Sequence, residues 1–335
     1  MRFGEVPITQ AAGTILAHSV AVQQGRLRKG QVLEVAHIAR LRAAGIETVT
    51  VARLDAGDCH EDTAARDIAA ALMADPGGDG LWLSRAFTGR VNVFAHAAGV
   101  VDMKADQLYQ LNRVNPLITV ATVPEYQQMA KGGMVATVKI ISYAVPEADV
   151  ARAVAHARGA MRLARPVYRN ASLIITEIPG GPGKKGRKAI EDRLAALEIT
   201  LVDTQTVPHD AAALAEAIAV AQGEMILILT GSATSDLDDV APSALRAAGG
   251  RVKRFGIPVD PGNLLFTGKF RKRPVIGLPG CARSPALNGA DWVLSRMACG
   301  IDVGNKDIAA MGVGGLLKEM PSRPMPRKGR KGGVS

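Results

Sequence analysis

Three aspartates stand shortly after an apolar run in the second half of the chain, where carboxylates could hold a cation or activate an anion. The run, residues 225–229, has the composition of a strand buried on both faces of a sheet. A loop of small residues, 230–232, comes next, and Asp236, Asp238 and Asp239 follow it. Ligands of open α/β sheets bind at the carboxyl ends of strands. Mg²⁺ is usually held by one or two carboxylates together with substrate phosphates, so the pattern indicates a Mg²⁺ or anion-activation site here.

The same carboxylates could instead cap helices. Asp239 lies three residues before Pro242, where a helix over residues 242–248 is predicted to begin, and aspartate is a favoured N-cap. Asp210 precedes a predicted helix that starts at Ala211 and presents the same choice. If Asp210 lies at a neighbouring strand end, it faces the first motif. The sequence leaves both roles open for each residue.

A Pro-Gly turn follows the strand predicted at residues 275–278. Pro279 and Gly280 lead towards a helix predicted at residues 285–297, and backbone N–H groups at a helix N-terminus can bind an anion. Arg283 could add a forked contact to a phosphate. A tight turn between strand and helix, without a ligand, is the alternative.

Basic residues are in excess, with a formal net charge of +10. Part of the excess lies in loops at residues 184–188 and 269–273, which could serve an anionic small molecule. The glycine-rich loop at 179–188 matches neither the Walker A nor the dinucleotide-binding fingerprint. No interleaving of aromatic and basic residues occurs, so we do not expect nucleic acid as a partner. The rest of the excess is in a C-terminal tail that contains Arg323, Arg327, Lys328, Arg330 and Lys331.

The elements that must position these residues alternate between strand and helix over residues 166–303. This alternation predicts an α/β domain of three layers, α/β/α, with a mostly parallel sheet. Residues 1–165 indicate a mixed α+β region, which could form two subdomains with a break near 75–80. A helix at 147–163 would connect it to the α/β domain. Residues 304–335 are expected to be a C-terminal extension that carries the basic tail.

Composition indicates a cytoplasmic protein. The 3 cysteines are too few and too scattered for a disulfide framework. The N-terminus lacks the apolar segment of a signal peptide, and no run of about 18 apolar residues occurs, so no membrane association is expected.

The motifs occur together in one order: a glycine loop, Pro-x-Asp, Thr-Gly-x with Asp-x-x-Pro, and Leu-Pro-Gly. In this order they resemble the molybdopterin-binding domain of molybdenum cofactor biosynthesis proteins, which include molybdopterin adenylyltransferases and molybdenum insertases. The resemblance covers about residues 170–300, and its most specific pieces are residues 230–231 with 239–242, and 278–280. Residues 29–49 are similar to the insertases. The whole chain resembles molybdopterin-binding halves that are fused to cytidylyltransferases.

The resemblance implies roles for individual residues. Asp239 and Asp210 would be catalytic, and Asp239 would hold the Mg²⁺ that supports substrate activation. Thr230, Gly231, Gly280 and Ser284 match residues that line the pterin-phosphate pocket. Together with the candidates from the motifs themselves, the predicted cofactor-binding residues are Thr230, Gly231, Ser232, Asp238, Pro279, Gly280, Arg283 and Ser284. Ser232 departs from the family, which has glycine there, and a Cβ would make a left-handed backbone less accessible.

Two functions follow from the resemblance. In the first, the protein binds molybdopterin or adenylylated molybdopterin and promotes Mg²⁺-dependent insertion of molybdate, as a molybdopterin molybdenumtransferase does. In the second, which the serine at 232 motivates, it is a non-catalytic carrier that passes the cofactor to a nucleotidyltransferase or a molybdoenzyme. The family also implies a homo-oligomer.

Overall fold

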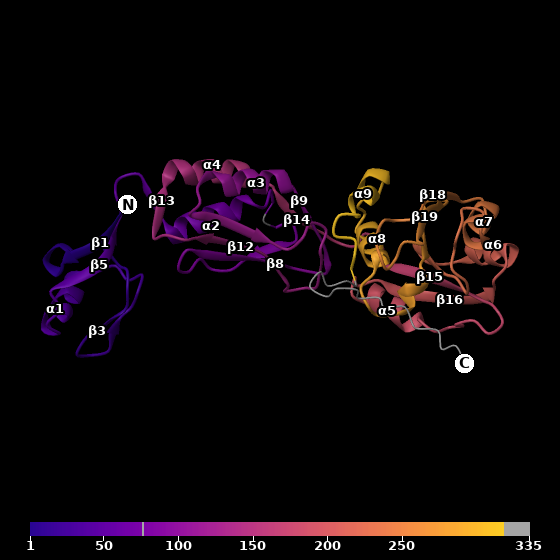
Figure 1. Ribbon diagram of the computed structural model, residues 1–335, viewed down its shortest axis with the longest axis horizontal. Helices are drawn as coiled ribbons and strands as arrows, with labels where there is room; N and C mark the ends of the chain where they lie inside the picture. Colours follow the sequence, from indigo (N-terminus) through magenta and orange to yellow (C-terminus); the bar gives the residue numbers. More distant parts are fainter. Residues whose placement is uncertain (76, 318–335) are drawn as a thin grey trace, which may run out of the picture. The chain divides into compact units, whose positions relative to one another are not determined.

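The structure is a computed structural model that describes residues 1–75 and 77–317. The basic tail that begins at Arg323 lies outside these residues. The chain divides into two compact units (Figure 1). The N-terminal unit comprises residues 1–97 and 101–163, and the C-terminal unit comprises residues 98–100 and those from Ala164 onward.

A small antiparallel sheet begins the N-terminal unit. Its central strand β5 (Thr48–Arg53) pairs with β1 (Arg2–Pro7) on one side and with β2 (Ile15–Leu16) on the other. Helix α1 (Val35–Ala43) buries Leu41 in the core beneath this sheet.

A four-stranded antiparallel sheet, in the order β10-β12-β8-β7, forms the larger part of this unit. Alternate residues of β8 (Val91, Val93 and Ala95) are buried in a core that also contains Ile68 of helix α2. This alternation is what a sheet with one covered face requires. The elements of this part are β6 (Asp58–His60), α2 (Glu61–Ala71), β7 (Leu81–Leu83), β8 (Arg90–Ala95), β9 (Gly99–Met103), α3 (Ala105–Val114), β10 (Ile118–Thr122), β11 (Gln128–Met129), β12 (Met134–Ile140), β13 (Ala144–Pro146), α4 (Glu147–Ala157) and β14 (Met161–Ala164). The short elements of the first part are η1 (Ile8–Gln10), β3 (Val20–Ala21) and β4 (Arg26–Leu27).

A six-stranded sheet organises the C-terminal unit, in the order β16-β15-β17-β20-β19-β18. The first four strands are parallel, and β19 runs antiparallel to β20 and to β18. The elements are β15 (Asn170–Glu177), α5 (Arg187–Ala195), β16 (Thr200–Pro208), α6 (Ala211–Val220), β17 (Met225–Leu229), α7 (Val240–Ala247), β18 (Arg251–Phe255), β19 (Phe266–Phe270), β20 (Arg273–Leu278), the 3-10 helix η2 (Gly280–Arg283), α8 (Gly289–Ala298) and α9 (Asn305–Ala310).

Helices cover both faces of this sheet (Figure 1). Helices α6 and α7 pack on one face, where Ile174, Ile226 and Ile228 point into a shared core. Right-handed crossovers place α5 on the other face, and an ion pair between Arg193 of α5 and Asp291 of α8 brings α8 to that side. The prediction of a three-layer α/β/α fold with a mostly parallel sheet is therefore confirmed.

Two predicted elements differ from the structure. The helix expected over 147–163 ends at Ala157, because Arg158 leaves the helical region and Gly159 has a φ of 60°, and strand β14 follows. The basic loop expected at 269–273 is the β19–β20 hairpin, with a left-handed Arg271 at its turn. This hairpin lies where β20 begins, at the amino edge of the parallel strands. Within the described part of the chain, no helix has the length and apolar composition needed to cross a membrane.

Candidate functional site

The carboxyl ends of four parallel strands bring the predicted motifs to one edge of the C-terminal sheet. Glu177 pairs with Pro208, and Leu229 pairs with both Ile175 and Leu278. The loops that leave these ends are residues 178–186, 209–210, 230–239 and 279–288. The first leads to α5 on one face and the third to α7 on the other. The crevice between β15 and β17 is thus the topological switch point where ligands of open α/β sheets bind.

The Thr-Gly-Ser loop lies at this switch point and is held by its own polar groups. The Thr230 hydroxyl donates to the Ser232 carbonyl at 2.6 Å. The Gly231 N–H donates to the Thr176 hydroxyl at 2.8 Å, and a Cβ added at Gly231 would lie 2.8 Å from the Thr176 carbonyl oxygen. Gly231 is therefore needed for close approach to β15. Ser232 is not among the residues of positive φ, so its Cβ meets none of the left-handed strain that was expected there.

Asp239 is the N-cap of α7. One carboxylate oxygen accepts the Val240 N–H at 2.7 Å, and the other accepts the Ser235 N–H at 2.9 Å. The helix begins at Val240, earlier than the predicted start at Pro242. Proline is tolerated in the first turn because the N–H groups there have no partner within the helix.

Asp210 is the N-cap of α6 in the same way. Its Oδ1 accepts the N–H groups of Ala212 at 2.9 Å and Ala213 at 3.1 Å. Among the residues that the structure describes, its second carboxylate oxygen has no hydrogen-bond partner. The capping alternative is thus what the structure shows for both predicted catalytic residues, although Asp210 keeps one oxygen available.

Asp236 and Asp238, the other two aspartates of the motif, interact with residues of their own loop and of α7. Asp236 accepts the Asp238 N–H at 2.8 Å. Asp238, whose side chain is 89% exposed, forms a 2.7 Å ion pair with Arg246 of α7. In this arrangement Asp238 stabilises the start of α7.

The predicted helix after the Leu-Pro-Gly turn begins later than expected. A short 3-10 helix, η2, directly follows Pro279, and α8 begins only at Gly289 with a capping box formed by Asn288 and Asp291. Ser284 uses its hydroxyl to accept the Ala286 N–H at 3.2 Å. The N-terminus of a long helix, which the predicted anion site requires, therefore does not lie at this turn. Gly280 is exposed, and a Cβ there would meet no atom within 4 Å.

Arg283 ties three loop segments of the carboxyl edge together. Its guanidinium donates to the carbonyls of Gly183 at 3.0 Å, Thr230 at 2.8 Å, and Lys185. Burial lowers the pKa of this guanidinium. At Gly186, where φ is 100°, a Cβ would lie 2.7 Å from the Arg283 Cα, so the glycine lets the basic loop pack against this residue. The forked contact that the sequence predicts for a phosphate is made here with backbone carbonyls.

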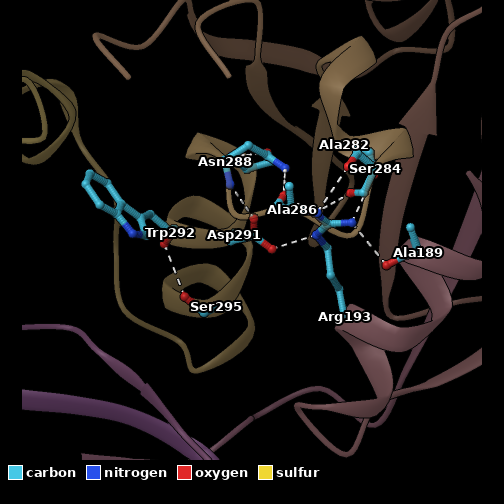
Figure 2. A network of polar contacts seen from close by, with 10 residues as sticks. Ala189, Arg193, Ala282, Ser284, Ala286, Asn288, Asp291, Trp292 and Ser295 are labelled. Carbon is cyan, nitrogen blue, oxygen red and sulfur yellow. Dashed lines mark hydrogen bonds and ion pairs between the residues drawn. The ribbon is translucent and has the colours of Figure 1, made fainter. Parts of the chain in front are cut away.

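Arg193 is a second organising arginine, which the sequence analysis missed. Figure 2 shows its guanidinium between α5 and the 282–291 segment. It forms a 2.6 Å ion pair with Asp291, and its own side chain is 9% exposed. It also donates to the carbonyls of Ala189, Ala282, Ser284 and Ala286. An arginine in a helix has no sequence signal that distinguishes this role.

A group of exposed basic residues at this edge lies in one loop and in the first turn of α5. Lys184, Lys185, Arg187 and Lys188 are exposed around the start of α5. A hydrogen bond to Asp192 raises the pKa of Lys188. The positive charge of this segment favours anionic ligands at the carboxyl edge. Among residues 1–75 and 77–317, no group of three or more His, Cys, Asp or Glu side chains is arranged to hold a metal ion.

Comparison with known proteins identifies the class of this unit. Residues 184–296 match the family described as "probable molybdopterin binding domain", and residues 5–53 match a domain family of unknown function (DUF8806). No curated protein matches the chain. The C-terminal unit is thus an α/β domain that brings four loops together at the carboxyl edge of its parallel strands. More particularly, residues 184–296 of this unit are similar to a probable molybdopterin-binding domain, in agreement with the resemblance found in the sequence.

Solved structures give further matches at low sequence identity. The molybdopterin biosynthesis MoeA protein from Pyrococcus horikosii is 15% identical, over 83% of this chain and 70% of that one, with a TM-score of 0.27. The molybdopterin biosynthesis enzyme MoaB from Thermus thermophilus is 12% identical, over 45% and 100%, with a TM-score of 0.28. The protein CinA, of unknown function, from Thermoplasma acidophilum is 17% identical, over 35% and 90%, with a TM-score of 0.26.

Proposed function

We propose that the carboxyl edge of the C-terminal unit binds molybdopterin, and that the chain acts on it in molybdenum cofactor biosynthesis. The observation that carries this proposal is the meeting of four loops at the switch point, within the segment that matches the molybdopterin-binding family. The open space around Gly280 leaves the backbone there accessible to a ligand. The lysines of residues 184–188 attract the phosphate that molybdopterin carries.

The reaction we propose for the bound pterin is Mg²⁺-dependent insertion of molybdate. Asp210 and Asp239 would hold Mg²⁺ together with phosphate oxygens of the ligand. They fit this ion because Mg²⁺ takes one or two carboxylates plus phosphates, and Asp210 keeps an oxygen that no described residue uses. Bound Mg²⁺ would neutralise negative charge on the phosphate oxygens and on the incoming molybdate. The basic loop would attract both anions to the same edge.

A second candidate is a carrier that binds molybdopterin without turnover. One observation favours it: both carboxylates are engaged as helix caps, and both oxygens of Asp239 accept backbone N–H groups. Such a carrier would hand the cofactor to a nucleotidyltransferase or a molybdoenzyme. In either case we propose that the protein works as a homo-oligomer in the cytoplasm.

The variants Asp210→Asn and Asp239→Asn separate the two candidates, because asparagine caps a helix as well as aspartate but carries no charge. Each protein is mixed with molybdopterin, molybdate and Mg²⁺, and the finished cofactor is measured by reconstitution of an apo-molybdoenzyme. Asp302→Asn, on the exposed C-terminal side of α8, is the matched control.

Insertion by the wild type and the control, with loss in both test variants and unchanged pterin binding, supports the enzyme. Pterin binding without Mg²⁺-dependent product in any of the proteins supports the carrier. Failure of the wild type to bind molybdopterin overturns both candidates.

A further inference from the structure

One buried hydroxyl connects the ends of three parallel strands at the switch point. Thr176, near the end of β15, is 0% exposed. Its Oγ1 accepts the N–H of Gly231, which follows β17, at 2.8 Å. The same oxygen lies 2.7 Å from Nδ1 of His209, which follows β16. The backbone of His209 is fixed as well, because its N–H donates to the Glu177 carbonyl at 2.9 Å.

The hydrogen-bond inventory around Thr176 determines which ring nitrogen of His209 carries the proton. A threonine hydroxyl has one hydrogen to donate and two lone pairs. The Gly231 N–H occupies one lone pair. If Nδ1 also donated, the Thr176 hydrogen would be left without any acceptor among the described residues, in a fully buried position, and that is unfavourable. The hydroxyl therefore donates to Nδ1, and neutral His209 carries its proton on Nε2.

The Nε2–H group is a donor at the switch point that has no acceptor among the described residues. His209 is half-buried, and within residues 1–75 and 77–317 only its Nδ1 has a side-chain hydrogen bond. Asp210 beside it is fixed as the cap of α6, so the segment that presents the ring is rigid. A donor held in one orientation loses little conformational entropy when a ligand accepts from it.

We infer that His209 binds the ligand of the carboxyl edge by donating its Nε2–H to an anionic oxygen of that ligand, and that Thr176 is the positioning residue that sets its tautomer. The inference rests on the proposed function, because the ligand it addresses is molybdopterin. His209 thus supplies a hydrogen-bond donor in addition to the lysines of the basic loop. A donor in a fixed position discriminates between ligands by where their oxygen lies, whereas mobile ammonium groups discriminate only by charge.

Two substitutions of His209 separate its two nitrogens. His209→Asn places an amide near Nδ1, so it can keep the Thr176 contact while losing the outward donor. His209→Gln places an N–H near the Nε2 position and keeps that donor. We expect His209→Asn to weaken molybdopterin binding about 10- to 100-fold, the usual effect of losing a hydrogen bond to a charged group, and His209→Gln to weaken it much less. His156→Asn, at an exposed histidine of α4, is the matched control and should bind as the wild type does.

Ring-nitrogen NMR of ¹⁵N-histidine protein tests the positioning role of Thr176 without a ligand. The wild type should show His209 with a protonated Nε2 and an unprotonated Nδ1. Thr176→Val should give a mixture of tautomers, a change that a merely structural hydroxyl would not produce. Added molybdopterin should shift the Nε2 signal of the wild type.

Each outcome bears on a distinct claim. If the wild type binds molybdopterin and His209→Asn binds it equally well, the role of His209 is wrong and the proposed function stands. If the wild type does not bind, the proposed function fails and the role of His209 fails with it. A proton on Nδ1 in the wild type overturns the positioning role of Thr176.

Discussion

The acidic residues at the start of α2 and those at the starts of α6 and α7 look alike in sequence and lie in opposite environments. Asp210 and Asp239 are exposed or half-buried, and each accepts backbone N–H groups of its helix. At α2 the cap is His60, whose Nδ1 accepts the Asp62 N–H at 3.2 Å. Glu61 is only 8% exposed, and no described residue donates a hydrogen bond to its carboxylate. Burial raises its pKa.

The difference comes from what packs against each carboxylate. At α6 and α7 the helix N-terminus faces the loops of the sheet edge, which leave room around the caps. At α2 a hairpin turn at Thr88 and Gly89 lies directly on Glu61, so that a Cβ on Gly89 would come within 2.5 Å of its Oε2. A carboxylate before a helix is thus a stabilising cap or a destabilising buried acid, depending on a neighbour far away in the chain.

Gly89→Ala should lower the unfolding free energy more than any other substitution proposed below. The new Cβ would also lie 2.7 Å from the Ile140 carbonyl, at a φ of 67°. Left-handed strain and overpacking against backbone together should cost roughly 3 kcal/mol of unfolding free energy. Urea unfolding followed by Trp82 fluorescence, in a Trp292→Phe background, reports on the N-terminal unit.

Gly25→Ala is the matched control for Gly89→Ala, because Gly25 has a φ of 89° with no atom within 4 Å of the added Cβ. It should show the strain alone, about 1–2 kcal/mol. If the two variants lost equal amounts of unfolding free energy, the turn at Gly89 would not be tightly packed against Glu61.

Glu61→Gln should change how stability depends on pH. Because burial raises the pKa of Glu61, the folded protein holds this proton at pH values where the unfolded chain has lost it. The stabilising contribution is complete below the ordinary value of 4.5 and is lost as the pH rises through the higher value of the folded state. The nearby charges are those of Lys139, Asp62, His60 and Lys29.

The glutamine variant lacks this titration, so its unfolding free energy should exceed that of the wild type increasingly above pH 4.5. Urea unfolding at several pH values, again with Trp82 as the probe, measures the difference. A variant that is less stable than the wild type at about pH 8 would show that the ionised carboxylate is stabilised in the fold. Glu5→Gln, at an exposed carboxylate of β1, is the control for general charge effects.

The edge of the C-terminal sheet could be predicted because its signals are local. Short apolar runs at residues 225–229 and 275–278 end in small residues, and these runs are strands that end together. Both capping aspartates were predicted with two roles each, since a cap and a metal ligand require the same side chain. The start of α8 was missed because the four residues after Pro279 form a 3-10 helix that ends before the capping box.

What could not be predicted depends on contacts between distant residues. Arg193 contacts Asp291, which is 98 residues away in the sequence, and Thr176 contacts His209, which is 33 residues away. The side chain of Glu61 lies against the hairpin turn at Gly89, which comes from another part of the unit. Side-chain type and spacing carry no record of such partners, because the fold alone brings them together.

Asp210→Ala and Asp239→Ala should each lower the stability of the C-terminal unit by about 1 kcal/mol, the usual cost of losing an N-cap. The corresponding asparagine variants should stay near the wild type, because asparagine accepts the same N–H groups. Trp292 fluorescence in a Trp82→Phe background follows this unit. A loss well above that of a cap in the alanine variants would mean that these carboxylates do more for the fold than satisfy the helix ends.

Arg246→Ala should have the smallest effect on stability. Its ion pair with Asp238 joins a side chain that is 41% exposed to one that is 89% exposed, and exposed pairs contribute roughly 0–1 kcal/mol. Asp238→Asn should be equally mild in urea unfolding. The two substitutions should differ in their effect on molybdopterin affinity. If Asp238 contacts the ligand, as the sequence predicts, Asp238→Asn will change this affinity and Arg246→Ala will change it little. Equal effects of the two substitutions on affinity would place Asp238 with the other caps, as a residue that acts only by holding the start of α7.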